Sequence, residues 1–189
     1  MDTYLIVGLG NPGPEYADTR HNAGFKAIDA LADELGVGYW KALSGALVAE
    51  AKHNDHRLIL IKPQRYMNLS GVPLKSLLKY YGLGEDERYG LLVVHDELDL
   101  PDGLLRLKNG GGHGGHRGVL SVIEAVGAEF FRLRIGIGRP PGRMPAERFV
   151  LLGLSGDDLA ELEASAQRAV PMILAVVDEG LSAAMNRYN

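Results

Sequence analysis

The sequence predicts an α/β fold: a single domain of three layers, in which a β-sheet lies between two layers of helices. Two observations predict this class. Short segments rich in Val, Ile and Leu alternate along the whole chain with longer segments of helical periodicity. The length of 189 residues fits one domain, and a chain of this size buries enough surface to form a core without disulfide bonds. We therefore expect residues 1–189 to form one domain.

Six β-strands are expected, each a short apolar run bounded by turn residues. They cover residues 3–9, 46–52, 57–62, 91–96, 104–108 and 131–138. A short polar turn joins the second and third strands, so we expect these two to pair antiparallel as a hairpin. Because strands and helices are mixed along the chain, helices should cover both faces of the sheet.

Four helices are expected from apolar residues that recur every three or four positions. Their apolar faces are formed by Phe25, Ile28, Leu31, Ala32 and Leu35; by Leu74, Leu77, Leu78 and Tyr81; by Val119, Leu120, Ile123 and Val126; and by Leu159, Leu162, Ala166, Val170, Ile173 and Val177. Asn22 and Ser70 are expected as N-caps of the first two helices, which Gly36 and Gly82 should end. Pro171 predicts a kink in the fourth helix.

Composition excludes several classes of protein. The chain has no cysteine, which rules out disulfides, thiolate nucleophiles and thiolate metal sites. The N-terminus lacks the basic region of a signal peptide, and no apolar run is long enough to span a membrane. We expect a soluble protein of the cytoplasm with no membrane partner.

Charge is distributed unevenly along the chain. The formal net charge is -4, whereas residues 103–150 carry eight basic residues against three Glu, a local charge of +5. The basic residues are Arg106, Lys108, Arg117, Arg132, Arg134, Arg139, Arg143 and Arg148. Two interpretations stay open for this segment: a phosphate-binding face on an acidic body, or ordinary solvated surface charge.

The segment LIVGLGNPG contains three glycines, Gly8, Gly10 and Gly13, at the spacing of the dinucleotide-binding fingerprint. That motif requires a helix that opens at the glycine turn. Here Pro12 and Pro14 intervene, and the first long helix is expected to begin near residue 23, so we reject a dinucleotide site. What is left is a loop at the C-terminal end of a strand, where α/β sheets build their sites. Its polar side chains are Asn11, Tyr16, Arg20, His21 and Asn22.

Three further polar clusters follow apolar segments: PQRYMNLSG (63–71), VVHDELDLPDG (93–103) and GGHGGHRG (111–118). Taken singly, Asn68 fits a helix cap and Asp96 a turn former, while His113 and His116 fit exposed loop residues. The third cluster opens a helix after glycines, with backbone amides free to meet an anion.

Together these residue types favour hydrolysis of an activated ester by water. Neither a cysteine nor a G-x-S-x-G motif is present, which argues against a covalent acyl-enzyme. A histidine oriented by an aspartate can deprotonate water near neutral pH, and asparagine amides can donate to an oxyanion. Metal binding is the competing use of the pairs His53-x-x-His56 and His113-x-x-His116. The first pair falls in the expected hairpin turn and the second in glycine-rich backbone, so we expect no catalytic metal.

Five motifs, in this order and spacing, resemble the bacterial-type peptidyl-tRNA hydrolases: VGLGNPGPEYADTRHNAGF, YMNLSG, VHDELDLPDG, GGGHGGHRG and LRIGIGRP. The resemblance extends from about Tyr4 to Tyr188. It implies a single α/β/α domain around a twisted mixed sheet. It also implies hydrolysis, with no metal and no cofactor, of the ester between a peptide and the 3′ ribose of tRNA, which recycles tRNA for protein biosynthesis.

The resemblance further implies roles for individual residues. His21 would be the general base that activates water, and Asp96 the carboxylate that orients it. Asn11 would sense the blocked α-nitrogen of the peptide, and Asn68 would hold the ester or the attacking water. The residues implied to line the cleft or bind tRNA are Tyr16, Tyr66, Met67, Asn68, His116, Arg117, Lys108 and Arg134, the last two clamping the 5′ phosphate. The implied partner is peptidyl-tRNA, bound through its acceptor stem and CCA end by a monomer.

One position departs from the family pattern. Arg117 stands where the family usually has asparagine, and arginine donates hydrogen bonds but cannot accept one. Either Arg117 contacts phosphate or the terminal ribose, or another group performs the role of the asparagine. The substitution also keeps open an alternative function, that of a catalytically silent tRNA- or RNA-binding protein on the same fold.

Overall fold

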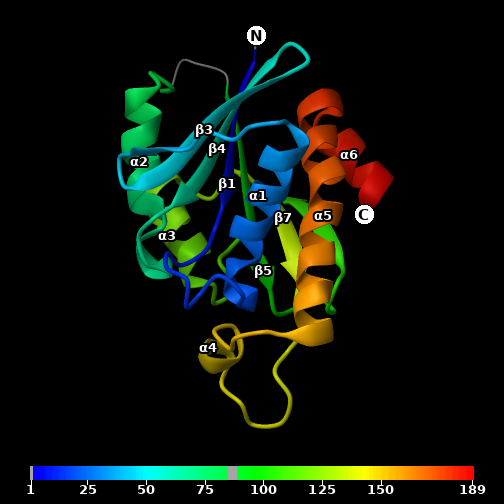
Figure 1. The fold of residues 1–189 in the computed structure, drawn as a ribbon. Coiled ribbons are helices and arrows are strands. Elements are labelled where there is room, and N and C mark those ends of the chain that lie inside the picture. Colours follow the sequence, from blue (N-terminus) through cyan, green and yellow to red (C-terminus); the bar gives the residue numbers. More distant parts are fainter. Residues whose placement is uncertain (1, 85–88) are drawn as a thin grey trace.

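The computed structural model describes residues 2–84 and 89–189, and in this part of the chain it shows a seven-stranded sheet of order β2-β3-β4-β1-β5-β7-β6 (Figure 1). The strands are β1 (Thr3–Gly8), β2 (Lys41–Leu43), β3 (Ala46–His53), β4 (His56–Pro63), β5 (Tyr89–Glu97), β6 (Leu105–Asn109) and β7 (Phe131–Gly136). The four strands β4, β1, β5 and β7 run parallel, and β2, β3 and β6 pair antiparallel with their neighbours. The sheet is therefore mixed, and the expected hairpin of β3 and β4 is confirmed.

Helices cover both faces of this sheet. The helices are α1 (Ala23–Glu34), α2 (Gly71–Tyr80), α3 (Arg117–Val126), α4 (Ala146–Phe149), α5 (Gly156–Glu179) and α6 (Leu181–Tyr188), with 3-10 turns η1 (Arg20–Asn22) and η2 (Met67–Leu69). Helices α1, α5 and α6 pack on one face, and α2 and α3 on the other (Figure 1). On β4, Leu58 and Leu60 pack in the core on the side of α1, α5 and α6, while Ile59 and Ile61 pack in the core on the side of α2 and α3. Alternate residues are thus buried on both sides, as a covered parallel strand requires, and the predicted α/β class is confirmed.

The expected strands and helices all form, with ends that differ from the predicted ones by at most three residues. Strand β2 and helices α4 and α6 were not predicted. β2 spans three residues that are exposed or half-buried, and α4 spans four, so neither shows a period in the sequence. Helix α5 continues across the exposed Pro171, and the kink there stays a prediction.

Two expected helix caps have a different role. Asn22 and Ser70 stand at the N-cap positions of α1 and α2, but neither side chain caps its helix. The Asn22 amide instead accepts from Asn11 N at 2.9 Å and donates to Asn11 O at 3.0 Å. The Ser70 hydroxyl donates to Met67 O at 2.8 Å. Both groups therefore fix the backbone of loops that lead into the candidate site.

Close packing explains the glycines of the first motif. A Cβ atom on Gly8 would lie 2.2 Å from the carbonyl oxygen of Gly24 in α1, and one on Gly10 would lie 2.6 Å from the ring of Phe25. Helix α1 begins at Ala23, well after these glycines, as expected for a sequence without a dinucleotide site. The glycines let the loop after β1 lie directly against α1.

Among the described helices, none is both long and apolar enough to cross a membrane.

Candidate active site

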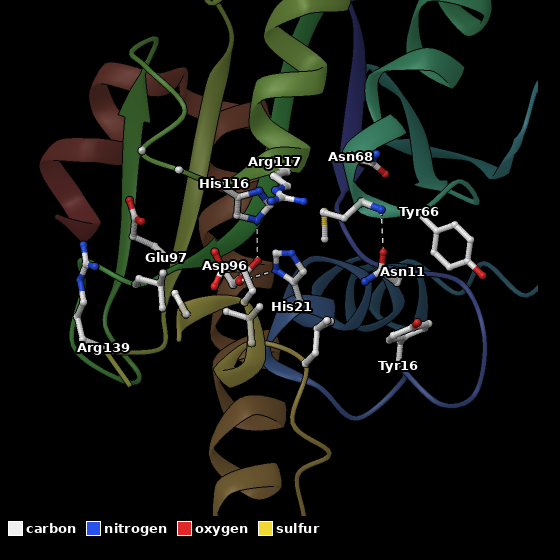
Figure 2. Close-up of a pocket in the computed structure, with 18 residues that line it drawn as sticks. Asn11, Tyr16, His21, Tyr66, Asn68, Asp96, Glu97, His116, Arg117 and Arg139 are labelled. Atoms are coloured by element: carbon white, nitrogen blue, oxygen red, sulfur yellow. Dashed lines mark hydrogen bonds and ion pairs between the residues drawn. The ribbon is translucent and has the colours of Figure 1, made fainter. Parts of the chain in front are cut away.

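A cleft of about 540 Å³ opens at the C-terminal ends of β1 and β5 (Figure 2). Nine of the residues predicted from sequence line it: Asn11, Tyr16, His21, Tyr66, Met67, Asn68, Asp96, His116 and Arg117. The predicted residues Lys108 and Arg134 lie outside this lining, on β6 and β7. The structure thus brings one predicted group together and leaves the proposed phosphate clamp apart from it.

His21 and Asp96 form the central pair of the cleft. His21 lies in η1, where its backbone N–H donates to Val150 O at 2.9 Å, and Asp96 lies near the end of β5. The distance from His21 Nδ1 to Asp96 Oδ2 is 2.9 Å. Because an ionised carboxylate only accepts, Nδ1 carries the proton, and Nε2 is left with a free lone pair. His21 is therefore in the tautomer that a general base requires.

The environment stabilises the charged forms of both partners. Burial lowers the pKa of His21, but the charge of Asp96 and its hydrogen bond outweigh this, and the net pKa lies above the usual value. Burial raises the pKa of Asp96, but His21 and His116 outweigh it, and this pKa lies well below the usual value. The pair can thus stabilise an imidazolium that forms when His21 takes a proton.

His116 holds the other oxygen of the same carboxylate. His116 Nε2 donates to Asp96 Oδ1 at 2.8 Å, and its Nδ1 accepts from the backbone amides of Gly118 at 3.1 Å and Val119 at 3.2 Å. Both ring nitrogens are therefore engaged within the protein. The amides of Gly118 and Val119 are thus not free for an anion, contrary to expectation, whereas a contact of His116 with substrate stays a prediction, since its ring lines the cleft. The imidazole caps α3 and fixes the orientation of Asp96.

His95 is a buried residue of this centre for which sequence reasoning gave no role. Its Nδ1 donates to Asp96 O at 2.7 Å, and its ring lies edge-on to that of His116 with 5.0 Å between centroids. Burial, and then the proximity of His116, lower the pKa of His95 to about 3, so the ring is neutral. His95 supports the backbone of Asp96 from within the sheet.

Asn11 presents an amide donor to the cleft. Its Oδ1 accepts from the backbone N–H of Met67 at 2.7 Å, which assigns the other atom of the amide as the NH₂ group. Asn22 holds the Asn11 backbone on both sides. Asn11 is 6% exposed and lines the cleft, so a fixed donor faces any bound ligand.

Asn68 lies exposed on η2, and the Tyr16 and Tyr66 rings meet edge to face at 6.4 Å.

Seven further side chains line the cleft that were not expected there: Glu97, Leu98, Arg139, Ala146, Glu147, Val150 and Leu151. The segment around α4 is bound to the loop that carries His21, through Leu154 N to Asp18 O at 2.8 Å and an isolated bridge between Thr19 and Gly153. These segments lie more than 130 residues apart in sequence, and no local pattern signals their contact.

The donor set of the centre bears on metal binding. His21, Asp96 and His116 offer ligand atoms that lie within 4.8 Å of one another. Each carboxylate oxygen of Asp96 already accepts from one imidazole, and the second nitrogen of His116 accepts two amides. A cation among these groups would have to displace both hydrogen bonds of Asp96. The contacts fit a hydrogen-bonded triad better than a ligand set.

The basic residues of segment 103–150 differ in how far they are buried. Arg132 is only 2% exposed, and it donates to the carbonyls of Gly111, Gly112 and Ala128, which ties the glycine-rich loop to β7. By register, Lys108 stands opposite Arg132 and Arg106 opposite Arg134, so all four side chains share one face of the β6–β7 pair. Arg134 Nη1 lies 3.8 Å from Glu97 Oε1. Arg132 is therefore part of the scaffold, while Lys108 and Arg134 are half-buried.

Comparisons with known proteins agree with one another. A family model described as peptidyl-tRNA hydrolase matches residues 5–189. The chain is 46% identical to a peptidyl-tRNA hydrolase of Leifsonia xyli, covering 100% of this chain and 98% of the relative, and 45% identical to that of Chloroflexus aggregans, covering 98% of each. A crystal structure of a mutant of Acinetobacter baumannii peptidyl-tRNA hydrolase superposes with a TM-score of 0.89 at 37% identity, covering 100% of this chain and 95% of that one. A Campylobacter jejuni nucleosidase, at 11% identity and a TM-score of 0.57, shares the fold alone.

Proposed function

Because this chain belongs to the peptidyl-tRNA hydrolase family, we propose that it cleaves the ester between a peptide and the 3′ ribose of tRNA with His21 as general base. The observation that supports this role is the 2.9 Å contact between His21 Nδ1 and Asp96 Oδ2, which leaves Nε2 free to accept a proton in the cleft. General-base assistance contributes about 10²- to 10⁴-fold to such a reaction.

The reaction follows from these positions. Water attacks the ester carbonyl carbon while His21 Nε2 takes one of its protons, and the imidazolium is stabilised by Asp96. The resulting oxyanion accepts hydrogen bonds from amide donors of the cleft, for which we propose Asn68. The tetrahedral intermediate then collapses, the bond from the acyl carbon to the ribose oxygen breaks, and that oxygen takes the proton from His21. The products are a free peptide acid and a tRNA with its 3′ hydroxyl.

Asn11 gives a physical basis for distinguishing peptidyl-tRNA from aminoacyl-tRNA. Its NH₂ group donates only, so it can bind the carbonyl oxygen of an acylated α-nitrogen. A free aminoacyl-tRNA carries an ammonium group there, which also only donates and would leave the Asn11 amide unpaired. We propose that this mismatch protects aminoacyl-tRNA from hydrolysis.

The direct test of the function uses N-acetyl-aminoacyl-tRNA and its unblocked counterpart, each with and without a chelator. We expect turnover of the blocked substrate alone and no effect of the chelator, because no step requires a cation. Binding of tRNA without turnover would support the silent RNA-binding alternative instead. Loss of turnover on chelation would contradict a reaction that needs no cation.

Replacing Asn11 by aspartate should lower kcat/KM for the blocked substrate about tenfold or more and reduce the preference over aminoacyl-tRNA. The carboxylate keeps the acceptor for Met67 N but replaces the donor with a charge that attracts an ammonium group. The ratio of kcat/KM for the two substrates measures the effect. An unchanged ratio would contradict the role of Asn11.

We propose that Lys108 and Arg134 bind a tRNA phosphate while the CCA end enters the cleft, with Arg117 on phosphate or the terminal ribose. Neutralising a phosphate releases counterions. A plot of the logarithm of the binding constant against the logarithm of the salt concentration therefore falls with a slope of about 0.7 to 0.9 per phosphate contact. Lys108→Ala and Arg134→Ala should each make this slope shallower by about the amount expected for one phosphate contact. Lys52→Ala, an exposed residue of β3, is the control. Slopes equal to that of the parent would contradict the clamp.

We further propose that residues 1–189 act as one domain and as a monomer in the cytoplasm, where tRNA is used. One chain supplies all the elements around the cleft, from the loop after β1 to α4.

A further inference from the structure

Three apolar residues form an exposed row that begins at the rim of the cleft. Tyr66 precedes η2, Leu69 ends it and Val72 lies in the first turn of α2. They are 61%, 43% and 50% exposed, respectively. A spacing of three residues places them along one side of this helical stretch. We call Tyr66, Leu69 and Val72 the η2–α2 row.

The row continues the apolar lining of the cleft outward. Tyr66 itself lines the cleft, together with Met67, and its ring meets that of Tyr16 edge to face. Leu69 and Val72 lie beyond the lining, farther along the same chain segment. Exposed apolar side chains that lie next to a site are typical of ligand-binding surfaces.

The order of the sheet separates this row from the basic residues. Strand β4, which leads into η2, lies on one side of β1, whereas β7 and β6, with Arg134 and Lys108, lie beyond β5 on the other side. Figure 2 shows the His21–Asp96 pair between these two ends, with Tyr66 on one side and Glu97 and Arg139 on the other. A substrate ester held at His21 with its tRNA toward the basic strands would extend its acyl part to the opposite side, where Tyr66 lies.

We propose that the η2–α2 row binds the second and third residues of the substrate's peptide, counted from the ester, and prefers apolar side chains there. This inference rests on the proposed function and adds to it a preference among peptides. Tyr66 and Val72 are six positions apart, or about 9 Å along a helix, which matches about three residues of extended peptide. Partial burial of apolar side chains on both partners then adds affinity that a polar peptide lacks.

The test compares two N-acetylated tripeptidyl-tRNAs that share the amino acid at the ester and carry either Leu-Leu or Ser-Ser before it. We expect kcat/KM for the Leu-Leu substrate to be about fivefold higher in the parent enzyme. The double variant Leu69→Ser/Val72→Ser should bring this ratio close to one, and each single variant should lower it part of the way. Because both residues are exposed, all variants should keep the melting temperature of the parent.

Tyr80→Ser is the matched control, since Tyr80 is an apolar residue, 58% exposed, at the far end of α2. It should leave the ratio at the parental value. A parental ratio near one, or a ratio that survives the double substitution, would overturn the inference while turnover of N-acetyl-aminoacyl-tRNA still supports the proposed function. Absence of turnover with every blocked substrate would instead remove the proposed function and this inference with it.

Discussion

Replacing His21 by alanine should lower kcat/KM for N-acetyl-aminoacyl-tRNA by about 10²- to 10⁴-fold. The variant lacks the Nε2 lone pair that accepts the proton of water, while the amide donors of the cleft are left in place. The side chain is partly exposed on a 3-10 turn whose backbone is held by Val150, so the fold should persist. Single-turnover rates, with circular dichroism to check folding, measure the effect.

His53→Ala is the matched control for this substitution. His53 lies in the β3–β4 hairpin and pairs with Asp178 on α5, away from the residues that line the cleft. Its kcat/KM should equal that of the parent. If His21→Ala retains activity within a few-fold of the parent, another group takes the proton and the role assigned to His21 is wrong.

Replacing Asp96 by asparagine should lower kcat/KM by about 10³- to 10⁴-fold, because it changes the tautomer of His21. Asp96 accepts hydrogen bonds from two imidazoles, and an asparagine amide offers only one acceptor. The tautomer of His116 is fixed by two amides of α3 that donate to its Nδ1. The new NH₂ group therefore faces His21 and donates to its Nδ1. The proton of the neutral ring then lies on Nε2, so Nε2 has no lone pair with which to accept a proton from water.

The pH profile gives an independent readout of the same pair. A general base must be deprotonated, so kcat/KM rises with pH through the pKa of His21 and then levels off. Asp96 raises this pKa, and the midpoint should lie above the ordinary value of about 6.5. In Asp96→Asn the charge is gone and burial dominates, so the remaining activity should rise at a lower pH. Asp102→Asn, an exposed carboxylate outside the cleft, should keep the parental profile, and an unmoved midpoint in Asp96→Asn would contradict the coupling.

Local patterns in the sequence predicted most of the fold. The apolar period of residues such as Leu74 and Leu77 marks α2, and the β-rich run of β4 marks a strand, because each depends on neighbours a few positions away. Strand β2 and helix α4 depend on contacts with distant segments and leave no period in the sequence.

The sequence predicted which residues line the site more accurately than it predicted the hydrogen bonds among them. His21, Asp96 and Asn11 do share one cleft, because loops after parallel strands meet at the same edge of a sheet. The sequence could not show that His116 turns inward to Asp96 or that Asn22 holds Asn11, since both side chains had equally plausible local roles. Arg132 likewise looks like its basic neighbours until its burial is known.

The hydrogen bond from His21 N to Val150 O has a practical consequence. It links the turn that carries the His21 imidazole to the part of the cleft lining that contains Leu98, Val150 and Leu151. Because the bond is made by the backbone of His21, a displacement of Val150 would also shift the 3-10 turn that carries the imidazole.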